Sequence, residues 1–187
     1  NILVGALAGD AITTGNSNIS VGHGSLSLNT ASHRNTAIGE FALSALNITT
    51  STNAYNTALG YSAGAGITTG LNNTLIGGLA GDAITTGDYN VAVGSASLSA
   101  NTTADHNSAL GADSLGKNTT GINNVAIGSS ALYNNTTADN NTAVGRSAGA
   151  AVTTGVENAI IGASAGDALT VGYQNVALGF QALSSDT

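Results

Sequence analysis

The sequence contains no cysteine, which excludes disulfide bridges and thiolate metal sites within this chain. Proline, methionine and tryptophan are also absent, and only 7% of the 187 residues are charged and 4% aromatic. So few large side chains cannot fill a broad globular core, while so low a charge is not typical of a disordered segment. The apolar content is mostly alanine, and 26 residues are glycine. This composition favours the tight stacking of a repeated backbone.

Positive charge is also scarce. The three basic residues, Arg34, Lys117 and Arg146, stand against ten acidic residues and leave a net charge of −7. Nucleic acid requires a basic footprint, and anionic lipid surfaces favour basic segments, so we expect neither partner. No apolar run approaches the ~18 residues of a membrane span, so we expect no membrane insertion of this segment.

A short repeat runs through the whole chain. The pattern Asn-x-x-(Val/Ile/Leu)-Gly begins at Asn1, Asn18, Asn35, Asn56, Asn73, Asn90, Asn107, Asn124, Asn141, Asn158 and Asn175. Successive starts lie 17 residues apart, except for a spacing of 21 between Asn35 and Asn56. We number the Asn as repeat position 0, which places Gly at position 4 of every copy. The pattern is already running at Asn1 and stops within a repeat at Thr187, so we expect one repeat domain over 1–187, a fragment of a longer fibre.

Each repeat is too short for a pair of helices, and its apolar segment is short, rich in β-branched residues and closed by Gly. These features predict short strands joined by tight turns. The expected fold class is all-β: a parallel β-solenoid of eleven 17-residue coils, stacked about 4.8 Å apart. The third coil carries the four extra residues, which we place within 46–55.

The repeated Asn and Gly have physical explanations. Asn at position 0 is expected to adopt a left-handed backbone at a corner, and its amide can bond to the same amide in the next coil. Gly at position 4 suits a positive φ or a place with no room for a Cβ. The expected structural ladder includes Asn18, Asn56, Asn90, Asn124 and Asn141, with Gly22, Gly60, Gly94, Gly128 and Gly145.

Two types of coil differ at positions 8 and 11. Some coils have Gly at position 8 and a large aliphatic at position 11, as in Gly81 with Ile84, whereas others have Leu and Asn, as in Leu98 with Asn101. Each type of coil has one branched aliphatic side chain, at position 8 in one type and at position 11 in the other. We therefore expect both positions to adjoin the same core space.

The strand at positions 1 to 3 is apolar or small on both faces. Charged and aromatic residues fall at positions 5, 6, 9, 10, 15 and 16, which we interpret as the water side, apart from Asp186 in the incomplete last repeat. A strand that is apolar on both faces is usually covered on both sides. The simplest cover is a second copy of the chain, so we expect a homo-oligomer with this strand nearest its axis.

Asn-Thr-Ala-Leu-Gly (56–60), Asn-Val-Ala-Ile-Gly (124–128) and Asn-Thr-Ala-Val-Gly (141–145), each followed by an Ala-containing segment and a Thr-rich turn, resemble the YadA-like head repeats of trimeric autotransporter adhesins. The 17-residue spacing is still more similar to repeats of bacteriophage tail-fibre proteins. The resemblance covers the whole chain. It implies a left-handed parallel β-roll, a homotrimer around one axis, and an extracellular role in reaching or binding a cell surface, either on a virion tail fibre or on a bacterium.

Exposed aromatic residues are the candidate contacts for a host-surface glycan or protein receptor, because amphipathic rings are favoured at contact surfaces. The alternative is that they cover grooves between neighbouring chains. The extra residues are a second candidate, because function concentrates where a repeat is interrupted. The candidate contact residues are Asn47, Tyr55, Tyr61, Tyr89, Tyr133 and Tyr173.

No motif supports catalysis or a cofactor. The segment 111–118 nearly matches a phosphate-binding loop, but Asn118 replaces the required Ser or Thr. Asp10, Asp82 and Asp167 share position 9 but lie in coils that are not adjacent, and calcium needs six to eight converging oxygens. The histidines at 23, 33 and 106 do not share a position. We therefore expect neither metal nor cofactor and no enzymatic activity, including that of catalytic solenoids such as acyltransferases and lyases.

Pairs of Thr near positions 12 and 13 suggest an alternative function, an ice-binding β-solenoid, because regular hydroxyls on a flat face can match an ice lattice. Such pairs include Thr85-Thr86 and Thr119-Thr120. We expect the two Thr of a pair to lie in a strand and point to opposite faces, which would prevent a two-column array.

Overall fold

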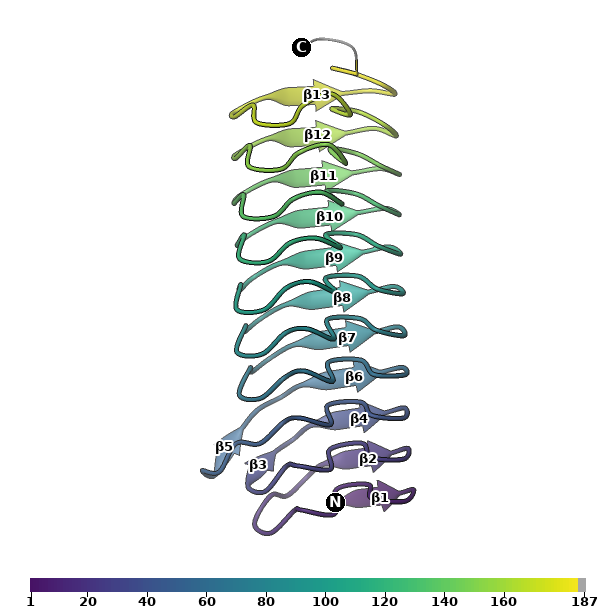
Figure 1. The fold of residues 1–187 in the computed structure, drawn as a ribbon, viewed down its shortest axis with the longest axis vertical. Coiled ribbons are helices and arrows are strands. Elements are labelled where there is room, and N and C mark those ends of the chain that lie inside the picture. Colours follow the sequence, from purple (N-terminus) through teal and green to yellow (C-terminus); the bar gives the residue numbers. More distant parts are fainter. Residues whose placement is uncertain (185–187) are drawn as a thin grey trace.

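The computed structural model describes residues 1–184 and is a single stack of coils with no helix in that range. Its main element is an eleven-stranded parallel sheet that runs the length of the stack (Figure 1). The strands of this sheet are β1 (Ile2–Val4), β2 (Ile19–Val21), β4 (Thr36–Ile38), β6 (Thr57–Leu59), β7 (Thr74–Ile76), β8 (Val91–Val93), β9 (Ser108–Leu110), β10 (Val125–Ile127), β11 (Thr142–Val144), β12 (Ala159–Ile161) and β13 (Val176–Leu178). The parallel β-solenoid expected from the repeat is therefore the fold of this chain.

The register of the sheet follows the repeat. Val125 pairs with Thr142, one repeat later, and Thr36 pairs with Thr57 across the longer spacing, so the extra residues leave the ladder unshifted. Each strand is only three residues long because the repeat Gly ends it. Gly128 has a φ of +126°, and a Cβ there would lie 2.6 Å from the carbonyl carbon of Gly145 in the next coil. Position 4 therefore needs glycine both for its backbone conformation and for the close approach of stacked coils.

The core of each coil is filled from positions 8 and 11, as the sequence predicts. Leu98 at position 8 and Ile84 at position 11 are both fully buried. A Cβ added to Gly81 would lie 2.8 Å from Cδ1 of Ile84, so the two positions share one space. Leu75, from position 2 of the same coil, also lies 2.8 Å from that point. The larger residues at position 2 therefore help to fill the core beside a Gly at position 8. The sequence analysis related only positions 8 and 11 and missed this contribution.

One prediction about the corner is wrong. The left-handed conformation falls on position 16, as in Tyr55 (φ 53°) and Asn72 (φ 57°), and not on the Asn that follows. The Asn directly precedes the strand and already bonds to the neighbouring coil: the carbonyl of Asn35, for example, accepts the N–H of Ile19 in the preceding coil at 2.8 Å. The chain must therefore turn one residue earlier.

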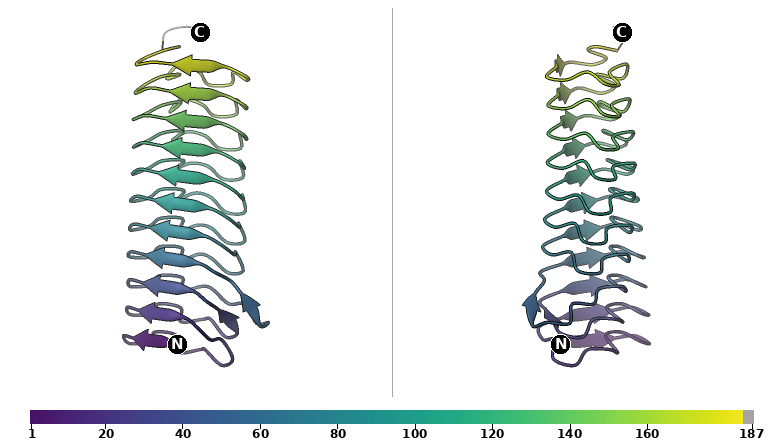
Figure 2. Two further views of the ribbon diagram at one scale, coloured as in Figure 1. Left: turned by 180° about the vertical axis from the view of Figure 1, so that it is seen from behind. Right: turned by 60° about the vertical axis from the view of Figure 1, so that its left-hand side comes forward.

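The extra residues form a small projection at one corner of the stack. Asn47 N–H still donates to Thr68 O, and Ala54 N–H to His33 O, so the additional length lies between Asn47 and Ala54. It contains β5 (Thr52–Asn53), which pairs in parallel with β3 (Ser32–His33) in the preceding coil. Two views show β5 projecting from the corner near the lower end of the main sheet (Figure 2).

Candidate functional site

The column of position-0 Asn side chains ties each coil to the next. Asn124 is fully buried; its Oδ1 accepts the backbone N–H of Asn141 at 2.9 Å, and its Nδ2 donates to Ala138 O at 2.8 Å. The same amide lies 3.2 Å from Oδ1 of Asn107. The amide ladder expected from the sequence is thus present, but it is supplemented by bonds to the backbone. Equivalent backbone bonds involve Asn18, Asn56, Asn73, Asn90, Asn107, Asn141 and Asn158.

Asn124→Ala should destabilise the chain by about 1–3 kcal/mol, because it leaves the buried N–H of Asn141 without a partner, whereas Ala138 O keeps its bond from Asn135 Nδ2. The measurement is the free energy of unfolding in urea, with hydrogen exchange of Asn141 as the local readout. Asn16→Ala removes an exposed amide and serves as the control. Equal effects of the two substitutions would contradict this role of the column.

Position 15 is less exposed than we expected from its charges. Asp88 Oδ1 accepts the N–H of Leu71 at 2.6 Å, and Asp105 Oδ1 accepts the N–H of Asp88 at 2.7 Å. His33 occupies the same position and is only 8% exposed; its Nδ1 accepts the N–H of Asn16 at 2.9 Å. The water-side interpretation is therefore wrong for His33, and Asp88 and Asp105 are half-buried because they bond the backbone of the coil below, whereas Tyr173 at the same position is exposed. The recurrence of Asp at position 15 was the feature of the sequence that could have indicated these bonds to the backbone.

The insertion is held by His33 and flanked by an Arg–Tyr contact. His33 Nε2 lies 2.8 Å from Ser51 Oγ in the inserted segment. Arg34 Nη1 donates to Tyr55 Oη at 2.7 Å, and its guanidinium carbon lies 5.5 Å from the centre of the Tyr55 ring. Asn47, at the start of the insertion, is exposed, and its Oδ1 accepts a hydrogen bond from the Thr30 hydroxyl at 3.2 Å. These contacts bring Asn47, Tyr55 and the insertion to one corner.

The other candidate tyrosines are spread over the surface and do not form one site. Tyr61, Tyr89 and Tyr173 are exposed, whereas Tyr133 is half-buried beneath the ammonium of Lys117, 4.8 Å from the ring centre. Tyr89 stacks on His106 with ring centres 5.0 Å apart. Tyr61 follows a strand, whereas Tyr89 and Tyr173 precede one. Tyr61 therefore lies beside the C-terminal ends of the strands, and the other two lie beside the N-terminal ends.

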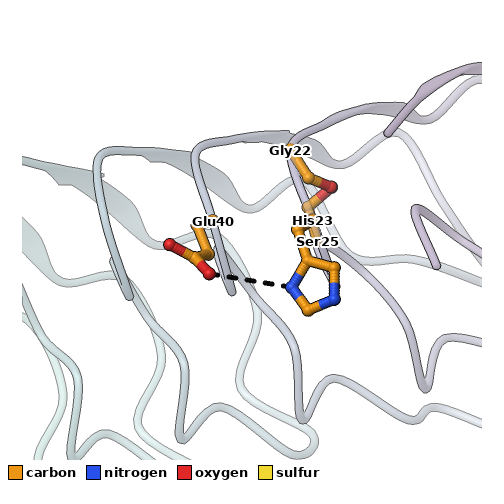
Figure 3. A network of polar contacts seen from close by, with 4 residues as sticks. All are labelled: Gly22, His23, Ser25 and Glu40. Atoms are coloured by element: carbon orange, nitrogen blue, oxygen red, sulfur yellow. Dashed lines mark hydrogen bonds and ion pairs between the residues drawn. The ribbon is translucent and has the colours of Figure 1, made fainter. Parts of the chain in front are cut away.

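A contact between a histidine and a glutamate connects two coils just after β2 and β4. His23 Nδ1 lies 3.7 Å from Glu40 Oε1, and both side chains are about half exposed (Figure 3). Phe41 meets the His23 ring edge-on at 5.2 Å. Below the histidine, Ser25 Oγ donates to Gly22 O at 3.0 Å and closes the turn. The His23–Glu40 contact lies on the surface, whereas Ser25 is fully buried and its hydroxyl is also bonded to the Ser20 hydroxyl.

The aspartates at position 9 and the segment 111–118, which the sequence analysis considered for a cation and a phosphate, do not come together in one site. Residues 1–184 contain no group of three His, Cys, Asp or Glu side chains that could hold a metal ion. The Gly111 that begins the phosphate-loop-like segment is the repeat Gly after β9, and a turn follows it. Asp10 and Asp167 are exposed, whereas Asp82 is half-buried.

Burial raises the pKa of the Asp82 carboxyl above its ordinary value of 3.8, and its Oδ1 has no hydrogen-bond partner within residues 1–184. The folded chain thus favours the protonated acid, so this group destabilises the fold increasingly as pH rises from about 4. Asp82→Asn should raise the free energy of unfolding at pH 7, and with it the melting temperature; the gain is at most about 1 kcal/mol because water screens a half-buried group. Thermal unfolding should show this gain disappearing as the pH falls through and below 4. The exposed Asp167→Asn is the control, and a gain that persists at pH 3 would contradict this explanation.

The Thr pairs are placed differently from our expectation. They lie in bends instead of strands, and both members reach the exterior: Thr119 is half-buried and Thr120 exposed. The hydroxyl of Thr119 donates to Thr136 O in the next coil at 2.9 Å. The prediction that the two Thr point to opposite faces is therefore wrong, because it assumed strand geometry at a corner.

The largest unpartnered feature is the outer face of the main sheet. Position 2 points inward, as in the fully buried Ala126, whereas position 3 points outward and carries Val, Ile or Leu in every coil. Ile127 is 40% exposed and Ile161 43% exposed. From behind, the strands form a continuous face along the stack (Figure 2, left). We call this row of position-3 side chains the apolar stripe.

No protein-family model matches this chain, and neither a curated protein nor a solved structure was found to match it. Within residues 1–184 there is also no helix that is long and apolar enough to cross a membrane.

Proposed function

We propose that this chain is a structural segment of a trimeric extracellular fibre, of a phage tail or a bacterial surface adhesin, that extends the fibre and serves in attachment to a host or cell surface. The observation that carries the proposal is the apolar stripe. An aliphatic side chain faces outward from all eleven strands, and such a long exposed row is rarely left uncovered on a monomeric protein.

The stiffness of the stack suits an extending role. Every coil is joined to its neighbours by the strand ladder and by buried Asn side chains, so the segment resists bending along its whole length. The role is non-enzymatic, because chemistry would need converging acid, base or nucleophilic groups. The insertion at Asn47–Tyr55 is the candidate contact for a glycan or protein receptor, since it alone interrupts the repeat.

The test of assembly is the solution mass of the segment by light scattering over a range of concentrations. The expected result is three times the chain mass of 18.0 kDa, persisting on dilution. A mass that stays at one chain at all concentrations would contradict the trimeric fibre.

One observation favours a second candidate, an ice-binding solenoid. Thr69, Thr86, Thr103, Thr120, Thr137 and Thr154 are exposed at position 13 of six successive coils. They form a regular column of hydroxyl groups beside the position-12 column. Freezing hysteresis at millimolar concentration tests this role, and its absence would end it.

A further inference from the structure

The insertion is held to the coil below by a histidine whose proton the hydrogen bonds locate. A backbone N–H can only donate, so His33 Nδ1, which lies 2.9 Å from Asn16 N, is an acceptor and carries no proton. The proton of the neutral ring therefore lies on Nε2 and is donated to Ser51 Oγ at 2.8 Å. This direction is the reverse of a serine nucleophile activated by histidine, because there the hydroxyl donates to the ring.

An imidazolium does not fit this site. Protonation would place a second N–H at Nδ1 of His33, so that two donors would face each other across the 2.9 Å to Asn16 N with no acceptor between them. The histidine is only 8% exposed, so there is little room for water to separate the two donors. Either the ring must leave its place or the N–H of Asn16 must lose its partner, and both changes cost a hydrogen bond that the neutral ring makes.

The charged groups near the ring also oppose its protonation. Neither the corner of the coil below nor the inserted segment 47–54 contains a titratable side chain. The neighbouring charges are Arg34, the next residue, and the amino group of Asn1, whose side chain bonds that same corner at 2.9 Å. Both groups are cations, and Tyr55, which bonds Arg34, is a neutral phenol near pH 7. No anion from these segments favours a positive ring.

Other coils use a carboxylate in the same place. Asp88, Asp105 and Asp139 also stand at position 15, and the Oδ1 of each accepts a backbone N–H of the coil below at 2.6–2.7 Å. His33 alone among these four acceptors is a side chain that ordinarily takes up a proton between about pH 8 and pH 5. It is also the one that lies beneath the insertion, since β3 pairs with β5.

The same ring anchors the projecting part of the insertion. Within residues 1–184, its bond to Ser51 is the one side-chain hydrogen bond that joins the segment 49–53 to another coil. The hydroxyls of Thr50 and Thr52 bond each other, and the ladder between β5 and β3 covers only two residue pairs. The projection seen beside the stack in Figure 2 is therefore weakly held once the ring is lost.

We infer that His33 is a pH-sensitive latch: the neutral ring holds the insertion against the stack, and protonation of the ring releases it. The insertion is thus most ordered where the ring is neutral and loses order as the pH falls through the range in which histidine takes up a proton. The consequence for attachment rests on the proposed function, because the insertion is the candidate receptor contact. The latch itself is a property of a single chain.

The place of the ring proton and the protection of the insertion test the latch together. At about pH 7.5, the nitrogen resonances of His33 should show a protonated Nε2 and an unprotonated Nδ1. Hydrogen exchange of the insertion, expressed relative to the unfolded peptide at each pH, should be about tenfold faster at about pH 5, which is the effect of one lost hydrogen bond. Exchange in β8, β9 and β10 should not change, because the stack remains intact.

Two variants distinguish the ring from other effects of acid. His33→Asn keeps a side-chain oxygen for Asn16 N–H, as Asp88 does for Leu71, but it does not titrate and cannot bond the insertion. Its insertion should therefore exchange at the parent's faster rate at both pH values. Ser51→Ala changes an exposed residue and should show this faster rate already at about pH 7.5.

Three outcomes would overturn the latch: equal exchange of the parent insertion at both pH values, a pH response that persists in His33→Asn, or a proton on Nδ1 of His33 at neutral pH. The solution mass is measured separately and reports on the fibre. A trimeric chain whose insertion ignores pH would overturn only the latch, and a monomeric chain whose insertion responds to pH would overturn only the fibre.

Discussion

Gly128→Ala should break the stack between β10 and β11 and lower the free energy of unfolding by about 3–5 kcal/mol, a loss large enough to abolish cooperative unfolding of the whole rod. The new Cβ would meet the carbonyl carbon and oxygen of Gly145, both at 2.6 Å, and the neighbouring coil cannot move away without stretching its sheet bonds. The φ of +126° adds a second cost, because side chains other than glycine rarely adopt it.

Urea unfolding followed by circular dichroism measures this effect, and hydrogen exchange in β10 and β11 locates it. Because coils contact only their neighbours, exchange should rise most near Gly128 and least near β1, the strand farthest from it. Gly78→Ala is the matched control, because a Cβ there has no heavy atom within 4 Å. A loss below 1 kcal/mol for Gly128→Ala, or an equal loss for Gly78→Ala, would show that close stacking does not explain the repeat Gly.

Ile127→Asp should convert the proposed trimer to monomers and leave the coil fold intact. Ile127 points outward from β10 and is 40% exposed in the single chain, so an Asp there remains hydrated when the chain is alone. In the proposed assembly the same carboxylate would be buried against apolar neighbours, which costs several kcal/mol. The expected result is a fall from three chain masses to one, with an unchanged circular dichroism spectrum.

Thr120→Asp introduces the same charge on an exposed corner and should leave the mass unchanged. A threefold mass for Ile127→Asp would mean that the apolar stripe is not the surface of assembly. The fall in mass must also occur without loss of the fold, because an unfolded variant reports only on stability. Together, Ile127→Asp and Thr120→Asp distinguish the effect of a charge on the apolar stripe from the effect of a charge elsewhere on the surface.

Much of the fold could be predicted because a 17-residue repeat multiplies weak signals. A single Gly or a single Asn indicates little, but Gly at position 4 of eleven coils predicts a place without room for a Cβ, and the 2.6 Å approach at Gly128 is that place. The exchange between Leu98 at position 8 and Ile84 at position 11 likewise indicates a shared core space, and the contact of a Gly81 Cβ with Ile84 is that space. The candidate contacts were less predictable, because the candidate tyrosines are spread over four repeat positions and only Tyr55 and Tyr89 share one.

The sequence by itself determined the class of fold and the strand register, because these follow from the spacing of the repeat, whereas it left both faces of each strand apolar and did not say which one faces the core. Only the tertiary structure decided how the corners are built. It assigned the left-handed residue to position 16, turned both Thr of each pair outward, and buried His33 beneath the insertion. These features depend on hydrogen bonds between coils, such as the one from Asn16 N–H to His33, which join residues that periodicity alone treats as equivalent.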